Sequence, residues 1–406
     1  MKTKQVFILS LLLTSILIQV AGAEEFKIRK NRPVIKNIPS AHYQWGVFQD
    51  VEILTGNSQR PVVLFALRKG VNPNPPGDRT VGLWHGYKDS QGQWHSRGIQ
   101  ILLTQYMKDH FNLTPPPVAN QTDNLMTACK DYNGKYHIFT SIPERIAPPS
   151  SRLLYVLWEQ DGRYKIKISN PLSDPTLHSM KCFADRQQNV HLFGRQTLTE
   201  IGYSPLVAYT INAQEQRNSQ NTFNYSRIAL PNSIQPSAFT IYKSHQALNI
   251  LYNNKHEAVL SLAQKSTRVR GVANLESGWN VLNANINPDG NANQIDEIKG
   301  FGIENESYVF GRRHSVYTQT NSDLPPNGVV YYHAKPARTV MGTITTWKNK
   351  GLIFRQDLVS LSVAAEAPRI SPHLAGITPQ GEIWAGFMDH GQTWKNQGVI
   401  FRANSH

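Results

Sequence analysis

A hairpin pattern that returns along most of the chain is the feature that most restricts its fold. In each copy a turn rich in Asn, Asp or Gly precedes five or six alternating apolar and aromatic residues, as expected for the second strand of a hairpin. The intervals between copies are 54 to 74 residues, the size of a four-stranded propeller blade. The sequence therefore predicts an all-β propeller of six blades, or of seven if a wide interval contains a divergent copy. The six copies are centred on Phe65, Phe139, Phe193, Tyr252, Phe310 and Trp384.

A second repeat marks the outermost strand of three blades. Trp94, Trp347 and Trp394 are each followed four residues later by Gly and then by an apolar strand. The first and last of them also share the preceding segment, since residues 84–89 match residues 384–389. Such agreement within one chain indicates a duplicated unit.

The turn at residues 389–394, Asp-His-Gly-Gln-Thr-Trp, resembles the Asp-box turn of the sialidase-like propellers, with Phe387 where that pattern has Ser. In this turn the Asp closes a hairpin and the Trp packs between strands. As a pattern of blades, the resemblance covers most of residues 45–402. It extends to exported propellers that include sialidases, polysaccharide lyases and fucose-type lectins. The resemblance implies a propeller that acts on or binds carbohydrate, and it assigns no catalytic residue.

The N-terminus predicts export. Lys2 and Lys4 precede an apolar run over residues 6–20, which ends in small residues before the acidic pair at 24–25. This is the pattern of a signal peptide cut after Ala23, and the run is short for a bilayer span. We expect a secreted or periplasmic protein without stable membrane insertion.

The mature chain is expected to be one basic domain. Removing residues 1–23 lowers the formal net charge from +14 to +12. Residues 24–44 are assigned to an N-terminal arm, which either stays separate or supplies a strand that closes the ring, and residues 45–406 to the propeller. A basic exported protein can meet nucleic acid, anionic membrane or acidic glycan. Because Lys/Arg runs suited to phosphates are missing, we expect a monomer whose partner is an acidic glycan and not nucleic acid.

Arginines follow the second strand in three of the predicted blades. Arg68, Arg195 and Arg312 occupy this position, and Arg313 and His314 come directly after. If they converge at the central tunnel, their planar guanidinium groups suit a carboxylate or a sulfate. These residues predict a binding site for a uronic-acid or sulfated polysaccharide. The alternative, that they are solvated at the rim or paired with neighbouring acids, stays open.

Two histidines, His137 and His191, occupy equivalent positions in neighbouring blades. A lyase that cleaves a uronic acid by β-elimination needs a neutraliser for the carboxylate, a base for the C5 proton and an acid for the leaving oxygen. Arg195, the two histidines and Tyr332 are the candidates for these roles. The alternative is that both histidines are packed against adjacent blades.

Two other functions fit the same fold. A carbohydrate-binding propeller without catalysis would use aromatic platforms, for which Trp84 and Trp384 are candidates. A sialidase-like glycoside hydrolase would need paired carboxyls, or a tyrosine nucleophile with a partner acid, and no motif identifies them.

Cys129 and Cys182 are the only cysteines, which excludes a disulfide scaffold and a four-thiolate zinc site. They precede hairpins of adjacent blades, so they either form one disulfide or remain free buried thiols. The sequence contains no Gly-rich phosphate loop, no metal-binding His pair and no acidic calcium loop. We therefore expect neither a cofactor nor a metal.

Overall fold

The computed structural model describes most of the chain after residue 43. The predicted signal peptide and all but the last residue of the predicted arm lie outside this part, so both stay predictions. Among the described residues, no helix is long and apolar enough to cross a bilayer. The described ranges are 44–72, 78–111, 126–143, 151–172, 177–196, 206–230, 236–243, 247–254, 260–266, 275, 279–286, 295–303, 306–313, 328–339, 342–365, 371–389 and 393–403.

Six antiparallel four-stranded sheets follow one another along the chain. We call them blades 1 to 6. Blade 2 gains a short fifth strand, β12 (Thr222–Phe223), which pairs in parallel with its outer strand. Two short helices lie between strands, α2 (Leu103–Phe111) and α3 (Ala213–Arg217). Blade 1 contains β1 (Gln44–Thr55), β2 (Val62–Asn72), β3 (Asp78–Lys88) and β4 (Trp94–Leu102), and blade 2 contains β5 (Met126–Lys130), β6 (Tyr136–Pro143), β7 (Ser151–Trp158) and β8 (Tyr164–Ser169). Blade 3 contains β9 (Leu177–Ala184), β10 (Val190–Gln196), β11 (Leu206–Ile211) and β13 (Ser226–Ala229), and blade 4 contains β14 (Pro236–Lys243), β15 (Ala247–Asn254), β16 (Leu260–Ser266) and β17 (Trp279–Ile286). Blade 5 contains β18 (Ile295–Ile303), β19 (Glu306–Arg313), β20 (Gly328–Thr339) and β21 (Gly342–Phe354), and blade 6 contains β22 (Ser360–Ala364), β23 (His373–Ile377), β24 (Ile383–Met388) and β25 (Trp394–Phe401).

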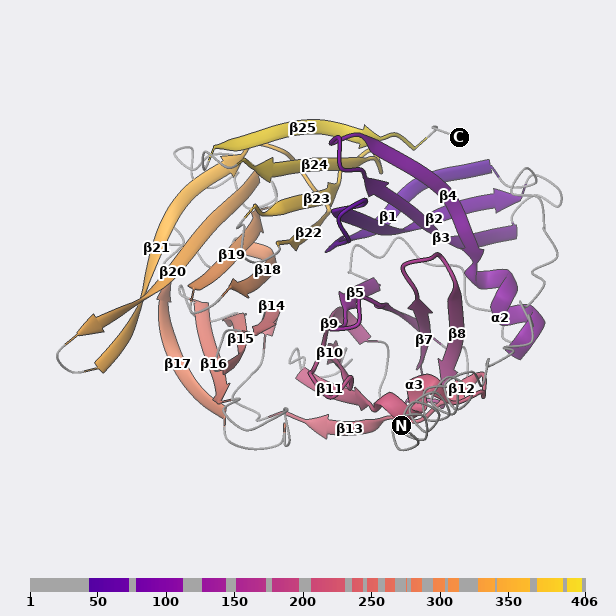
Figure 1. Cartoon of the computed structure of the whole chain (residues 1–406), viewed down its shortest axis with the longest axis horizontal. Coiled ribbons are helices and arrows are strands. Elements are labelled where there is room, and N and C mark those ends of the chain that lie inside the picture. Colours follow the sequence, from indigo (N-terminus) through magenta and orange to yellow (C-terminus); the bar gives the residue numbers. More distant parts are fainter. Residues whose placement is uncertain are drawn as a thin grey trace, which may run out of the picture. The chain divides into compact units, whose positions relative to one another are not determined.

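The blades form a closed ring around a central axis (Figure 1). The first strand of each blade lies innermost, and each of these strands contacts the first strand of the next blade, including β22 with β1. The predicted propeller is therefore confirmed, with six blades among the described residues. The two widest intervals in the sequence contain helix α2 in one case and the long hairpin of β20 and β21 in the other.

Apolar clusters between neighbouring blades form the core. On β2, Val63 and Phe65 pack toward blade 2, whereas Leu64 and Ala66 pack toward blade 6. A strand places successive side chains on opposite faces, so one alternating run can supply two clusters at once. Apolar residues recur on both faces of these strands because both faces are buried.

The sequence repeat locates the second strand correctly in blades 1 to 5, but in blade 6 the predicted position is displaced by one strand. The run at residues 382–385 was predicted to be a second strand, but it opens β24, the third strand of blade 6. The displacement has a local cause, because the turn before β24 has the same form as the turn before β6. Gly381 and Gly134 both have positive φ, at 73° and 80°. Turn chemistry identifies a hairpin but not its place in a blade.

The repeated tryptophan element lies where the sequence predicts it. Its three copies form β4, β21 and β25, which are the outermost strands of blades 1, 5 and 6. The glycine four residues after each tryptophan, Gly98, Gly351 and Gly398, has a φ between 72° and 79°. This left-handed conformation accompanies irregular pairing in all three strands, and it explains why glycine recurs there.

Candidate functional site

Two of the predicted arginines, Arg68 and Arg312, are bonded to backbone carbonyls within the protein. Arg68 is buried, donates from Nε to the carbonyl of Gly46 at 3.0 Å, and also bonds the carbonyl of Ala403 near the other end of the chain. Arg312 donates to the carbonyl of Leu358 at 3.0 Å in the next blade. Arg195 lies near the C-terminal end of β10, where it pairs with Leu206 at the start of β11, and is partly exposed.

The contacts of Arg68 and Arg312 support the alternative that these groups are paired within the protein. The side chain of Arg313 and all of His314 lie outside the described residues.

The predicted catalytic histidines belong to tight turns. His137 is fully buried, with Nδ1 at 2.8 Å from the hydroxyl of Tyr155 and Nε2 at 3.4 Å from Asp131. His191 is likewise buried, with Nε2 at 3.2 Å from Asp185.

Each of these aspartates also closes its turn. Asp131 accepts the backbone N–H of the residue four positions on at 2.8 Å, and Asp185 does the same at 2.9 Å. Asp389, in the turn that resembles the Asp box, makes the same bond at 2.9 Å. The two histidines therefore hold turns together, as expected if they are packed structural groups.

The predicted aromatic residues are core residues. Tyr332, Trp84 and Trp384 are all at most 2% exposed. The indole N–H of Trp84 donates to Ser96 at 3.2 Å, and that of Trp384 donates to Asn396 at 2.8 Å. Stacking on a sugar requires an exposed ring face, which these rings do not offer.

Buried charges gather instead around the axis of the ring. Lys299 Nζ lies 3.0 Å from Glu52 Oε1 and 3.4 Å from Glu297 Oε1, and Glu297 also lies 3.4 Å from Arg312 Nε. The two carboxylates raise the pKa of Lys299 against the opposing effect of burial. Lys181 is buried beside them, and burial together with the Lys299 ammonium lowers its pKa to about 8. Glu297 also accepts the backbone N–H of Leu361 in blade 6 at 2.8 Å, so this axial cluster connects blades 1, 3, 5 and 6.

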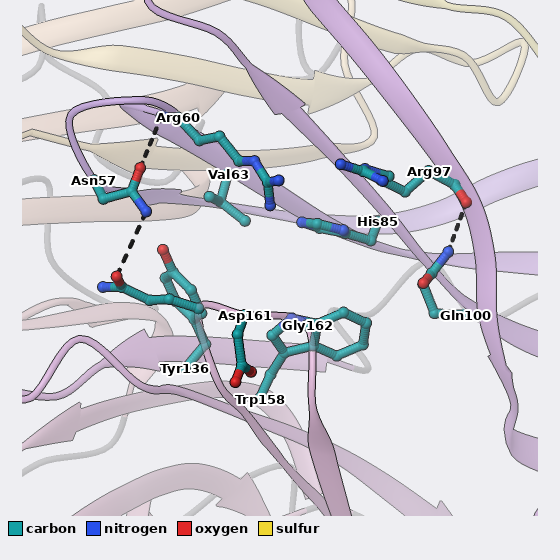
Figure 2. Close-up of a pocket in the computed structure, with 11 residues that line it drawn as sticks. Asn57, Arg60, Val63, His85, Arg97, Gln100, Tyr136, Trp158, Asp161 and Gly162 are labelled. Atoms are coloured by element: carbon teal, nitrogen blue, oxygen red, sulfur yellow. Dashed lines mark hydrogen bonds between the residues drawn. The ribbon is translucent and has the colours of Figure 1, made fainter.

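A pocket lies elsewhere, between blades 1 and 2 (Figure 2). It is a cavity of about 130 Å³, at the end of the blades where β1 turns into β2, β3 into β4 and β7 into β8. The predicted arginines follow the opposite ends of the second strands. The lining residues are Asn57, Arg60, Val63, His85, Arg97 and Gln100 from blade 1, and Tyr136, Trp158, Gln160, Asp161 and Gly162 from blade 2.

Side-chain amides fix the wall of this pocket. The Oδ1 atom of Asn57 accepts the backbone N–H groups of Gln59 and Arg60 at 3.0 and 2.9 Å, which orders the loop that carries Arg60. Its amide nitrogen donates to Gln160 at 3.5 Å, across the boundary between the two blades. The pocket is thus built by contacts between segments about one hundred residues apart.

Two guanidinium groups give the pocket a positive charge. Arg60 and Arg97 lie over the ring of Tyr87, at 4.7 and 5.4 Å from its centroid. Neither has a carboxylate partner within 4.0 Å among the described residues. Asp161, the only acid in the lining, is paired with Arg163 at 2.6 Å. The two arginines are therefore available to an anion from solution.

His85 forms part of the floor of the pocket. Its ring stacks on Phe65 at 5.2 Å and lies 5.3 Å from the ring of Trp158. Burial, followed by the positive charges of Arg60 and Arg97, lowers the pKa of His85 to about 4. The imidazole is therefore neutral at pH 7.

Two residues of this pocket lie in the duplicated segments of the sequence. His85 stands where the second copy has Ala385, and Arg97 stands where it has Gln397. Other positions differ as well, such as Lys88 and Met388, which do not line the pocket, so the repeat by itself does not identify the site.

The two cysteines face each other across the boundary of blades 2 and 3 as free thiols. Cys182 Sγ lies 3.9 Å from the carbonyl of His137, the residue paired with Cys129 in the sheet. Burial, and then a hydrogen bond with Cys182, raises the pKa of the Cys129 thiol well above its ordinary value.

Prolonged incubation with oxidised glutathione is expected to join Cys129 and Cys182 and release two reduced glutathione molecules. Intact mass spectrometry should show the loss of two hydrogens, and the free energy of unfolding should rise by about 4 kcal/mol for a loop of this length. Cys129→Ser serves as the control. A mixed disulfide with glutathione in place of the internal bond would contradict the expected proximity.

No family model and no curated protein matches the chain. Solved structures match its fold. A protein of unknown function from Dyadobacter fermentans has a TM-score of 0.50 at 8% identity, over 85% of this chain and 94% of that one. The six-bladed Aleuria aurantia lectin has a TM-score of 0.46 at 7% identity, over 90% and 97% of the two chains. A Trypanosoma rangeli sialidase has a TM-score of 0.46 at 10% identity, over 84% and 54%. At these identities the similarity is one of fold alone.

Proposed function

We propose that the protein binds an acidic saccharide in the pocket between blades 1 and 2. The observation that carries this proposal is the pair of guanidinium groups, Arg60 and Arg97, that face the cavity without a carboxylate partner among the described residues. Planar guanidinium groups pair with carboxylates and sulfates through two parallel hydrogen bonds.

The remaining lining suits the other parts of a sugar. The amides of Asn57, Gln100 and Gln160 can each donate and accept hydrogen bonds, as sugar hydroxyls require. Tyr136 and Trp158 also line the cavity, but each is 3% exposed, so they bound it and do not offer a ring face for stacking. The lining is mainly polar, which suits a ligand that carries several hydroxyl groups and an acidic group. We place this role outside the cytoplasm, in line with the predicted signal peptide, for a protein that acts as a monomer.

Calorimetric titration with matched oligosaccharides tests the proposal. Uronic-acid and sulfated oligosaccharides are expected to bind, whereas neutral oligosaccharides of equal length are not. Because the attraction is electrostatic and both arginines are at least partly exposed to solvent, the affinity should fall as the salt concentration rises. Equal affinity for neutral and acidic ligands, or no binding of either, would contradict the proposal.

A second candidate function is β-elimination at the same pocket. Arg60 and Arg97 could neutralise a uronate carboxylate, and the imidazole of His85 could accept the C5 proton at a pH above the pKa that it has in the complex. The C4–O bond would then break as a C4–C5 double bond forms, and the hydroxyl of Tyr136 could supply the proton for the leaving oxygen. The lining contains one carboxyl, Asp161, so it does not offer the acid pair of most glycoside hydrolases.

Incubation with a panel of uronic-acid polysaccharides distinguishes lyase from lectin. A lyase would produce unsaturated products that absorb in the ultraviolet, and His85→Ala would abolish them. His191, the catalytic histidine that the sequence predicts, does not line the pocket, so His191→Ala is the comparison variant. Binding without any unsaturated product would leave the lectin function alone.

A further inference from the structure

We propose that the pocket takes up a proton on His85 when it binds an anionic saccharide, so that the affinity for the ligand rises as the pH falls. This inference rests on the proposed function, and it adds a pH dependence to the same site.

The position of His85 is the first support. The side chain is 6% exposed and lines the cavity, and Figure 2 shows its ring beside the guanidinium groups of Arg60 and Arg97. It has no hydrogen-bond partner among the described residues, in contrast with the turn histidines His137 and His191. A buried polar group without a partner, at the wall of a cavity, is placed to contact what enters the cavity.

The charges around His85 are the second support. Arg60 faces the ring from the loop between β1 and β2, and Arg97 faces it from β4. The titratable groups on the remaining sides are Tyr87 on β3, Tyr136 on β6 and Asp161 in the turn after β7. Since Asp161 is paired with Arg163, the ring lies in a net positive environment while the pocket is empty of ligand.

An anion between the arginines would reverse this environment. Burial and the two guanidinium groups hold the pKa of His85 at about 4 in the ligand-free protein. A carboxylate or sulfate would cancel the repulsion and give the imidazolium a counter-ion, so the pKa of His85 would rise on binding.

Linkage is reciprocal, so a ligand that favours the protonated histidine is itself bound more tightly by it. Between the bound and the free pKa, each unit of decrease in pH should raise the affinity by up to about tenfold. Above the bound pKa, the affinity should not change with pH.

Calorimetry with a sulfated oligosaccharide tests the inference, because a sulfate ester stays ionised over the whole range. The titration is run at pH 7 and pH 5, each in two buffers with different ionisation enthalpies, which counts the protons taken up. We expect uptake approaching one proton per ligand at pH 5 and tighter binding there than at pH 7. His85→Gln is expected to abolish both the uptake and the gain in affinity.

The matched control is His373→Gln in blade 6. Burial, followed by Lys88, also lowers the pKa of His373 to about 4, but the residue does not line the pocket. This variant should keep the full pH dependence. If His85→Gln does not fold, the NMR titration of His85 in the wild-type protein, with and without ligand, gives the same answer through its pKa.

The outcomes separate the two proposals. If no acidic oligosaccharide binds at either pH, the proposed function fails and the inference fails with it. If the sulfated ligand binds with one affinity at both pH values and without proton uptake, only the inference is overturned. Uptake that persists in His85→Gln would assign the proton to another group and would also overturn it.

Discussion

Replacing both Arg60 and Arg97 with alanine is expected to weaken the binding of an acidic oligosaccharide by at least about 100-fold. A hydrogen bond to a charged group contributes about 1.5–3 kcal/mol, and about 1.4 kcal/mol corresponds to a factor of ten in affinity. Each single substitution should therefore cost about 10- to 100-fold. Calorimetry at low salt measures the effect.

Two further variants make this result specific. Arg60→Lys keeps the charge but loses the planar pair of donors, so it should bind with intermediate affinity. Arg186→Ala removes an exposed arginine from the turn between β9 and β10 and should leave the affinity unchanged. Equal losses in Arg186→Ala and the double variant would show that net charge, and not the pocket, attracts the ligand.

Replacing Glu297 with alanine is expected to lower the free energy of unfolding by about 3–5 kcal/mol. The residue is buried, it lies within 3.4 Å of Lys299 and Arg312, and it accepts the backbone N–H of Leu361 at 2.8 Å. Its removal would leave two buried cations with fewer partners and an unpaired backbone donor in the neighbouring blade. Urea denaturation followed by tryptophan fluorescence measures the change.

An exposed ion pair in the same sheet provides the comparison. Lys335 lies 2.9 Å from Glu306, and its side chain is 63% exposed. Because water already solvates this lysine, Lys335→Ala should cost about 1 kcal/mol or less. Similar losses in Lys335→Ala and Glu297→Ala would mean that the axial cluster does not hold the blades together.

The fold could be read from the sequence because its signals are local. A turn aspartate bonds the backbone four residues on, as Asp89 and Asp131 do, and a glycine adopts positive φ within each of these turns. The alternation of Val63, Leu64 and Phe65 follows from the geometry of a single strand. Such features recur in several blades, so their repetition predicts the ring without any knowledge of its contacts.

The candidate site could not be read in the same way, because its residues meet only after the ring closes. Arg68 and Arg312 both lie near the end of the second strand of their blades, yet each finds its partners in other segments of the chain. Equivalent sequence positions give equivalent places in a blade, but the neighbours of a side chain depend on the adjacent blade.

The sequence by itself determined the all-β class, the blade length, the turn chemistry and the outer tryptophan strands, since interactions within one hairpin specify each of them. Only the tertiary structure decided which charges are paired and which face a cavity. It placed Arg68 against the carbonyl of Ala403, and it left Arg60 and His85 at a boundary that blade 2 completes with Trp158. The physical reason is that pairing and burial arise from contacts between distant segments, which a local pattern does not contain.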